Sequence, residues 1–126
     1  MNNPEYISGT GNNFVISEYD KPKTDIEIIS IVADSVIDVD GVIFVEKIDT
    51  QTVKMHYYNN DGSTAELCVN GVRCVAKYAI DNSIVDRNKI TVIAPLGNIE
   101  TVINEDSVSI QISIPTYEHE KIIIDN

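Results

Sequence analysis

Short stretches of alternating apolar and polar residues recur along the chain and predict several β-strands. Alternation places successive side chains on opposite faces of a strand, so that one face can be buried. The stretches that fit this pattern are residues 13–19, 42–48, 52–59, 89–95, 98–103 and 107–114. The sequence NNDG, residues 59–62, ends the third of them and is typical of a chain reversal.

A different spacing, close to the period of an α-helix, appears in residues 24–38. Thr24 can cap a helix N-terminus, and Glu27 lies at the position that completes a capping box. The apolar residues that recur at helical spacing are Ile28, Ile31, Val32 and Val36. The pattern therefore predicts a helix in this segment.

A second helix is predicted over residues 70–80. Its apolar residues fall on neighbouring turns, and few of its residues are charged. They are Val72, Val75, Ala76 and Ala79. A helix of this composition must bury its surface, so we expect an α+β fold in which a curled, mostly antiparallel sheet wraps around a central apolar helix. Residues 1–126 are enough for a single domain with a buried core.

The chain is strongly acidic, with 20 Asp and Glu against 9 Lys and Arg and a formal net charge of −11. A phosphate backbone or an anionic membrane surface would repel it, so neither nucleic acid nor a membrane is an expected partner. No apolar run approaches the roughly 20 residues that span a bilayer, and the N-terminal sequence MNNPEYISG lacks signal-peptide features. We therefore expect a cytoplasmic protein.

Both cysteines, Cys68 and Cys74, lie in or next to the second predicted helix. In a reducing compartment, a cysteine is more often a buried apolar residue, a metal ligand or a reactive thiol than half of a disulfide. Their separation corresponds to a rotation of about 240° around a helix, so the two thiols do not share a face. Cys74 is therefore expected to be a small core residue.

Cys68 stands just before or at the first turn of this helix, near backbone N–H groups that lack an intrahelical acceptor. These groups and the helix dipole favour a thiolate and lower the pKa of a cysteine. The N–H groups from Val69 to Gly71 can also bind a carboxylate. This combination suits proton removal at the α-carbon of an amino acid, although a buried core cysteine fits the residues equally well.

Other kinds of site have little support in the sequence. His56 and His119 form no metal-ligand spacing with the cysteines, so no metal site is expected. The loop GTGNNF, residues 9–14, lacks the spacing of phosphate-binding and dinucleotide-binding loops. The acidic residues show no spacing typical of a glycosidase pair.

Two motifs resemble those of one enzyme family. SGTGNNFVI, residues 8–16, is similar to a loop of the form G-x-G-N-D-F. YNNDGSTAELCVNGVRCVAKY, residues 58–78, resembles F-N-x-D-G-S-x-x-x-x-C-G-N-G-x-R-C. Both motifs belong, in this order, to the N-terminal half of diaminopimelate epimerases, and a weaker likeness continues through KITVIAPLGNIETVI, residues 89–103.

The resemblance implies a two-domain enzyme with its amino-acid substrate in the cleft between two similar halves. One thiolate removes the α-proton of LL-diaminopimelate, and a thiol of the other half protonates the opposite face to give meso-diaminopimelate. The resemblance implies no cofactor, neither pyridoxal phosphate nor a metal. It makes Cys68 the first of the two thiols.

The same resemblance implies the residues that bind the substrate. Asn12 and Asn59 correspond to substrate-contacting amides, and the backbone of Val69 and Asn70 corresponds to the site of the α-carboxylate. Gly71 keeps this turn compact. The substrate is thus expected at the start of the second helix.

Three positions depart from the family pattern. Val69 replaces a glycine, Asn13 replaces an aspartate, and Gly41 stands where the family has a glutamine. The loss of a side chain at Gly41 removes a substrate contact and raises the question of a different amino-acid substrate.

The chain is about half as long as a complete enzyme of the resembled family, so we expect the equivalent of its N-terminal half. Such a half lacks the second thiol, requires a C-terminal half or partner chain, and catalyses nothing by itself. Its uncovered cleft face should expose an apolar patch and favour self-association into a homo-oligomer.

Two alternatives remain open. A related racemase or isomerase, of the proline racemase or phenazine-biosynthesis type, would act on another amino acid, and α-proton exchange with several amino acids separates this alternative. A non-catalytic binding or assembly module of the same fold would show no exchange and would keep its ligand affinity when Cys68 is replaced.

Overall fold

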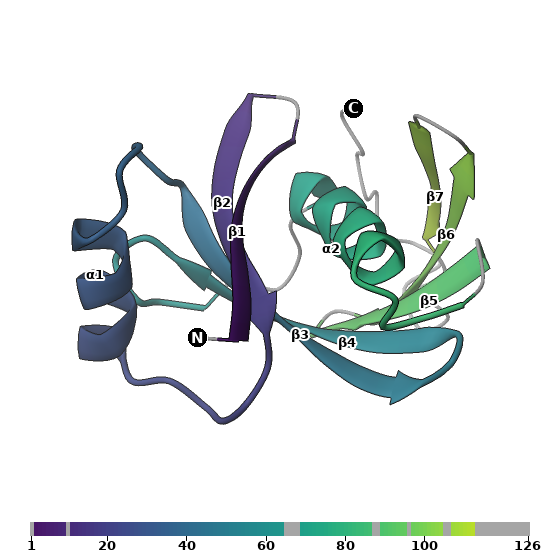
Figure 1. The fold of residues 1–126 in the computed structure, drawn as a ribbon, viewed down its shortest axis with the longest axis horizontal. Coiled ribbons are helices and arrows are strands. Elements are labelled where there is room, and N and C mark those ends of the chain that lie inside the picture. The colour runs from purple at the N-terminus through teal and green to yellow at the C-terminus, as the bar shows by residue number, and fades with distance from the viewer. Residues whose placement is uncertain are drawn as a thin grey trace, which may run out of the picture.

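Seven strands form one sheet in the computed structural model, which describes residues 2–9, 11–64, 69–86, 89–95, 97–104 and 107–112. The strands lie side by side in the order of the sequence (Figure 1). They are β1 (Asn2–Gly9), β2 (Asn12–Glu18), β3 (Gly41–Asp49), β4 (Thr52–Asn59), β5 (Lys89–Ala94), β6 (Gly97–Asn104) and β7 (Ser107–Ile112). The helices are α1 (Asp25–Ala33) and α2 (Val69–Asp81). The predicted α+β class is confirmed.

Most neighbouring strands are antiparallel. The antiparallel pairs are β1–β2, β3–β4, β5–β6 and β6–β7, whereas β2–β3 and β4–β5 are parallel. A parallel pair requires a crossover that returns the chain to the end of the sheet where it started. The first crossover contains α1 and the second contains α2. Each helix therefore belongs to the connection that carries the chain from the end of one strand back to the start of its parallel neighbour.

The second helix, α2, confirms the helix predicted over residues 70–80. It lies between β1 and β2 on one side and β6 and β7 on the other (Figure 1), and it contacts residues of all seven strands. Its buried side chains belong to the larger of two cores and are Val72, Cys74, Val75, Ala76, Tyr78 and Ala79. Burial, with the nearby carboxylates of Glu18 and Glu5, raises the pKa of Tyr78 to about 12. The interior around α2 is thus well shielded from water.

The first helix, α1, begins where the sequence predicts. The Glu27 backbone N–H donates to Thr24 Oγ1 at 3.2 Å, and the Thr24 N–H donates to Glu27 Oε1 at 3.0 Å. These two bonds form a capping box. Ile28 is fully buried in a second core, with Val15, Val39, Val42 and Phe44. Because side chains alternate along β3 and β4, this core lies on the face of the sheet opposite α2.

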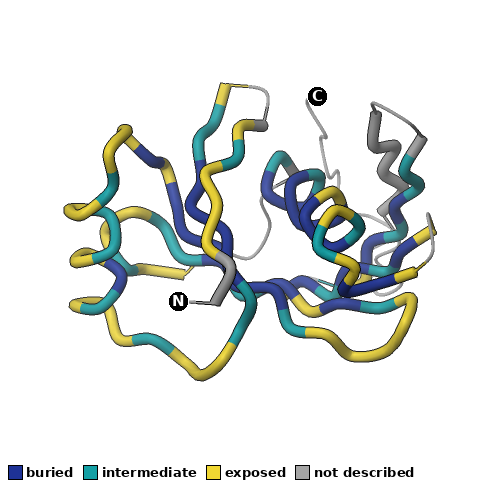
Figure 2. The backbone as a smooth tube through the Cα atoms, viewed as in Figure 1, coloured by how far each residue is buried: buried dark blue, intermediate teal, exposed yellow. Residues whose placement is uncertain are grey.

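The predicted extension of α1 to Val36 is wrong. The helix ends at Ala33, and Val36 is 83% exposed. Ser35 Oγ donates back to the Ile31 carbonyl at 2.9 Å, and the Val36 N–H donates to the Tyr6 hydroxyl instead of to a helical carbonyl. Figure 2 shows mostly exposed and half-buried residues along α1. Within the part of the chain that the structure describes, no helix is long and apolar enough to cross a membrane.

The sequence pattern does not predict β1. Its apolar residues Tyr6 and Ile7 are adjacent and do not alternate, and Pro4 has no N–H for a strand ladder. The structure accommodates Pro4 because β1 is an edge strand and its register with β2 shifts between Asn2 and Glu5. Pairing with β2, and not local sequence preference, therefore makes this segment a strand.

Replacing Thr24 tests the capping box. Thr24→Ala should lower the free energy of unfolding by about 1 kcal/mol, because the Glu27 N–H loses its acceptor. Ser30→Ala, at an exposed position of the same helix, is the control and should not lower it. Chemical denaturation measures both, and equal stability of Thr24→Ala and the unmodified chain would contradict the capping role.

Candidate active site

The candidate site lies at one end of the sheet, where β2 and β3 begin and β4 ends. Gly41, the first residue of β3, pairs with Phe14 of β2 and with Asn59 of β4. Asn12 starts β2 two residues before Phe14. The strand pairing thus brings Asn12 and Asn59, both predicted to contact substrate, to the same end of the sheet.

A hydrogen bond joins this end of the sheet to the start of α2. Asn70 Nδ2 donates to Asn12 Oδ1 at 2.6 Å, although the two residues are far apart in the sequence. Asn12 Nδ2 in turn donates to Asp40 Oδ2 at 3.4 Å, just before β3. The structure therefore brings together two predicted site residues, Asn12 and Asn70, from the two different motifs.

Asn59 belongs to a tight loop beside this contact. Its side-chain amide donates to Ser63 Oγ at 3.0 Å, and its backbone N–H donates to the Ser63 carbonyl at 2.7 Å. Asp61 Oδ1 accepts from the Ser63 hydroxyl at 2.6 Å and from its N–H at 2.9 Å, and these two bonds hold the pKa of Asp61 below its ordinary value. Gly62 has a φ of +89°, and a side chain there would collide with Asp25. The loop therefore has one defined shape, with Asn59 bonded to Ser63.

The remaining predicted site residues lie at the beginning of α2. Val69 is its first residue, and Gly71 is buried in its first turn. The N–H groups of a first turn have no acceptor within their own helix and carry the positive end of the helix dipole. Cys68, the predicted catalytic thiol, lies outside the described residues, and its assignment stays a prediction.

Cys74 and His56, the other candidate side chains of the sequence, are accounted for by their packing. Cys74 is 4% exposed, as expected for a core residue. His56 Nε2 lies 2.8 Å from Glu46 Oε1, and its ring stacks on Tyr19 with centroids 4.0 Å apart. His119 lies outside the described residues. Within the described part, no group of three or more His, Cys, Asp and Glu side chains could hold a metal ion.

Sequence reasoning missed Asp40 and Tyr57. Asp40 accepts from the Asn13 N–H at 2.9 Å as well as from Asn12. Tyr57 lies over Gly41: a Cβ built on Gly41 would come within 2.6 Å of Tyr57 Cε1 and 2.8 Å of its hydroxyl oxygen. The Tyr57 ring therefore fills the space of a side chain at position 41. A glycine directly after an aspartate, in the sequence VDG, was the only signal of this close approach.

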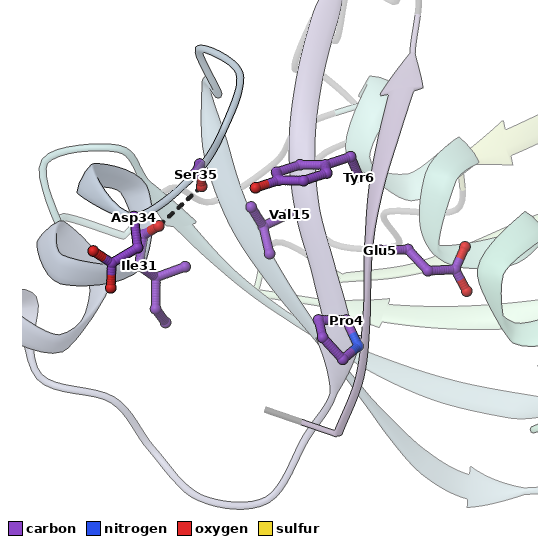
Figure 3. A pocket seen from close by; sticks show the side chains of 7 residues that line it. All are labelled: Pro4, Glu5, Tyr6, Val15, Ile31, Asp34 and Ser35. Carbon is purple, nitrogen blue, oxygen red and sulfur yellow. Dashed lines mark hydrogen bonds between the residues drawn. The ribbon is translucent and has the colours of Figure 1, made fainter.

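A cavity of about 270 Å³ lies between α1 and the β1–β2 pair, and its described lining contains no predicted site residue. Figure 3 shows Glu5 pointing away from it, toward α2. Another cavity, of about 400 Å³, is lined by Tyr57 and Thr64 from the region of the candidate site, with Lys54, Met55, His56, Tyr58, Ile93, Ala94 and Pro95. The second cavity is therefore the better placed to extend the candidate site.

Substitution of Gly41 tests the close approach of Tyr57. Gly41→Ala should destabilise the protein by about 1–3 kcal/mol, because the new methyl group would overlap the Tyr57 ring and the Tyr58 carbonyl. The cost should be smaller in a Tyr57→Leu background, where the ring is absent. Equal costs in both backgrounds, measured by chemical denaturation, would show that Tyr57 does not set this constraint.

Removal of the Ser63 hydroxyl tests the loop beside Asn59. Because the pKa of Asp61 is lowered from 3.8 in the folded protein, its bonds stabilise the loop above pH 3.8 and are lost as the pH falls through the folded-state value. In Ser63→Ala the pKa of Asp61 should rise toward 3.8, as followed by carboxyl carbon NMR. The pKa of Asp49, lowered chiefly by the Gln51 N–H, is the internal control. An unchanged Asp61 pKa would refute this account of the loop.

Comparison with known proteins connects this geometry to a family. The family model described as diaminopimelate epimerase matches residues 6–117. A diaminopimelate epimerase of Bacillus mycoides is 33% identical over 112 residues, which cover 82% of this chain and 39% of that protein. One of Brachyspira hyodysenteriae is 36% identical over 128 residues, covering 92% of this chain and 46% of that protein. The chain thus spans less than half the length of these relatives.

Solved structures share the fold. A phenazine biosynthesis protein of the PhzF family from Enterococcus faecalis matches with a TM-score of 0.60 at 13% identity, covering 75% of this chain and 35% of that one. A methylitaconate-delta-isomerase matches with a TM-score of 0.60 at 11% identity, covering 82% of this chain and 35% of that one. The length of the sequence match and the resemblance of the two motifs around Asn12 and Asn70 together lead to one conclusion: this chain belongs to the diaminopimelate epimerase family.

Proposed function

We propose that this chain is one half of a cofactor-independent epimerase that converts LL-diaminopimelate to meso-diaminopimelate. The observation that carries the proposal is the 2.6 Å bond between Asn12 and Asn70. It joins the two motifs of the family resemblance at the first turn of α2, directly after Cys68 in the sequence. Residues that the resemblance assigns to one substrate therefore meet in one place.

The chemistry follows from the start of α2. The α-proton of an amino acid is a very weak acid, so a thiolate removes it only if the negative charge that develops toward the carboxylate is stabilised. Backbone N–H groups at Val69 to Gly71 would supply that stabilisation, which is worth a few kcal/mol for one well-placed donor. The first turn of α2 contains no acidic residue that would oppose the carboxylate. Cys68 would accept the proton as a thiolate and become a thiol.

Epimerisation needs a second thiol on the opposite face, which would protonate the carbanion and become a thiolate. Cys74 is buried in the core and is therefore unsuited to this role. We therefore propose that the second thiol comes from a C-terminal half or partner chain, since the matched relatives are more than twice as long as the matched segment. In this proposal the isolated chain is inactive.

We also propose that the sheet curls around α2 as a central helix. The contacts of α2 with all seven strands support a sheet curled around a central helix as the unit that each half would contribute. A closed pair of such halves would exclude water from the substrate and strengthen its electrostatic contacts. We place this enzyme half in the cytoplasm, because its substrate is a small amino acid of biosynthetic metabolism in the resembled family.

A second substrate class is favoured by one observation. Tyr57 occupies the space above Gly41 where the resembled family carries a glutamine. A phenol ring in place of an amide changes the size and polarity of the substrate pocket beside Asn59. A related isomerase acting on another amino acid is therefore our alternative proposal, and a non-catalytic module of the same fold would keep the ligand site without exchange.

Binding to the isolated chain tests the proposed site. Titration of the ¹⁵N-labelled chain with LL-diaminopimelate should shift resonances of Asn12, Asn59 and Asn70 in fast exchange, as expected of weak binding by one half. Asn98, exposed on β6, is the internal control. Asn70→Ala keeps the backbone N–H but removes the side-chain bond to Asn12, and should weaken binding by about fivefold, the size of one ordinary hydrogen bond. Shifts confined to other surfaces would contradict the site.

Catalysis by the chain alone tests its proposed incompleteness. In deuterium oxide, the purified chain should form no meso-diaminopimelate and should leave the α-proton of the LL isomer in place. Incorporation of deuterium without epimerisation would show that Cys68 works as a base without its partner. Robust epimerisation by the 126-residue chain would refute the half-enzyme proposal.

Self-association is a further part of the proposal. Large apolar side chains are exposed on α1 and the segment after it, at Ile26, Ile29, Val36 and Ile37. These residues lie on the side of the sheet opposite α2 and not on the expected cleft face, but exposed apolar groups of this kind still favour association. Light scattering over a range of concentrations should therefore detect oligomers, and a strictly monomeric chain at high concentration would argue against this part.

A further inference from the structure

We infer that Asp40 is a positioning residue that fixes the orientation of the Asn12 amide and, through Asn12, that of the Asn70 amide at the start of α2. None of these three residues is adjacent to another in the sequence. Their order in space is Asp40, Asn12 and Asn70, and each neighbouring pair is joined by a side-chain hydrogen bond.

The carboxylate of Asp40 is held in place by the chain itself. The Asp40 backbone N–H donates to the Asn13 carbonyl at 2.7 Å, and the Asn13 N–H donates to Asp40 Oδ2 at 2.9 Å. These reciprocal bonds connect the residue before β3 to the second residue of β2. Two bonds between the same pair of residues leave the carboxylate little freedom to move.

The fixed carboxylate then determines which way the Asn12 amide faces. Oδ2 of Asp40 also accepts from Asn12 Nδ2, at 3.4 Å. A carboxylate accepts hydrogen bonds but donates none, so the amide nitrogen of Asn12 must face Asp40 and its oxygen must face away. That oxygen accepts from Asn70 Nδ2 at 2.6 Å. The orientation set by Asp40 is therefore passed on to Asn70.

This orientation matters for ligand binding. If the proposed function is correct, the substrate carboxylate lies at the first turn of α2 beside Asn70. An amide that is already held in one orientation loses less conformational entropy when a ligand binds. Asn12 also lies between the Asp40 charge and the helix N-terminus, so the carboxylate can orient the amides without occupying the anion site itself. The effect of Asp40 on ligand binding thus rests on the proposed function. The chain of side-chain hydrogen bonds from Asp40 through Asn12 to Asn70, which we call the relay, does not.

A triple-mutant thermodynamic cycle tests the relay without any ligand. Asp40 and Asn70 share no hydrogen bond in the described structure, so Asp40→Ala and Asn70→Ala should have independent effects unless Asn12 links them. We expect the two substitutions to be coupled by at least about threefold in the unfolding constant. The coupling should vanish in an Asn12→Ala background. The lost bond to the Asn13 N–H cancels, because it occurs in both arms of the cycle.

Asp38→Ala is the matched control, because it also removes a nearby acidic side chain. Asp38 accepts from Asn13 Nδ2 through its backbone carbonyl, which the substitution keeps. Asp38→Ala should show no coupling to Asn70. Asp40→Asn keeps an oxygen acceptor and should retain part of the coupling, which guards against loss of folding in the alanine variant. Independent effects of Asp40 and Asn70, or coupling that persists without Asn12, would overturn the inference.

Measuring diaminopimelate binding to the same variants distinguishes failure of the relay from failure of the proposed function. Asp40→Ala should weaken LL-diaminopimelate binding by about fivefold, the size of one ordinary hydrogen bond, whereas Asp38→Ala should not. If the unmodified chain binds no diaminopimelate but the coupling is present, the proposed function fails and the relay stands. If the chain binds diaminopimelate at Asn70 and Asp40→Ala changes neither binding nor coupling, the relay fails and the proposed function stands.

Discussion

Burial of α2 is the constraint on which the rest of this structure depends. The helix contacts every strand of the sheet, and its apolar side chains form much of the larger core. A helix held along its length cannot shift without opening that core, because protein interiors are close-packed. Its N-terminus is therefore fixed at the end of the sheet where β2 and β3 begin, and the contact between Asn12 and Asn70 follows from this placement.

Local sequence patterns predicted the elements whose form is decided locally. The capping residues Thr24 and Glu27 marked the start of α1, and the apolar spacing of Val72 to Ala79 marked α2. The predictions failed where contacts between residues far apart in the sequence determine the secondary structure. β1 is a strand because β2 pairs with it, despite Pro4, and α1 stops before Val36 because Tyr6 supplies the next hydrogen-bond acceptor.

The candidate site was predictable where its residues belong to continuous sequence motifs. Asn12 and Asn70 each belong to such a motif, and the resemblance implied that both lie at one substrate site. Asp40 and Tyr57 were not predictable, because their importance comes from contacts across strands that spacing along the chain does not encode. Gly41 carried a hint, since a glycine at a strand start often marks a close approach by another group. The catalytic role of Cys68 stays a prediction.

We propose that Cys68 is a reactive thiolate just before α2, and selective alkylation would distinguish such a thiolate from an ordinary buried cysteine. Peptide mass spectrometry can follow Cys68 and Cys74 separately across pH, with and without LL-diaminopimelate. We expect rapid labelling of Cys68 below pH ~8, slowed by the ligand, and very slow labelling of the buried Cys74. Equal, slow labelling of both cysteines that is indifferent to the ligand would contradict it.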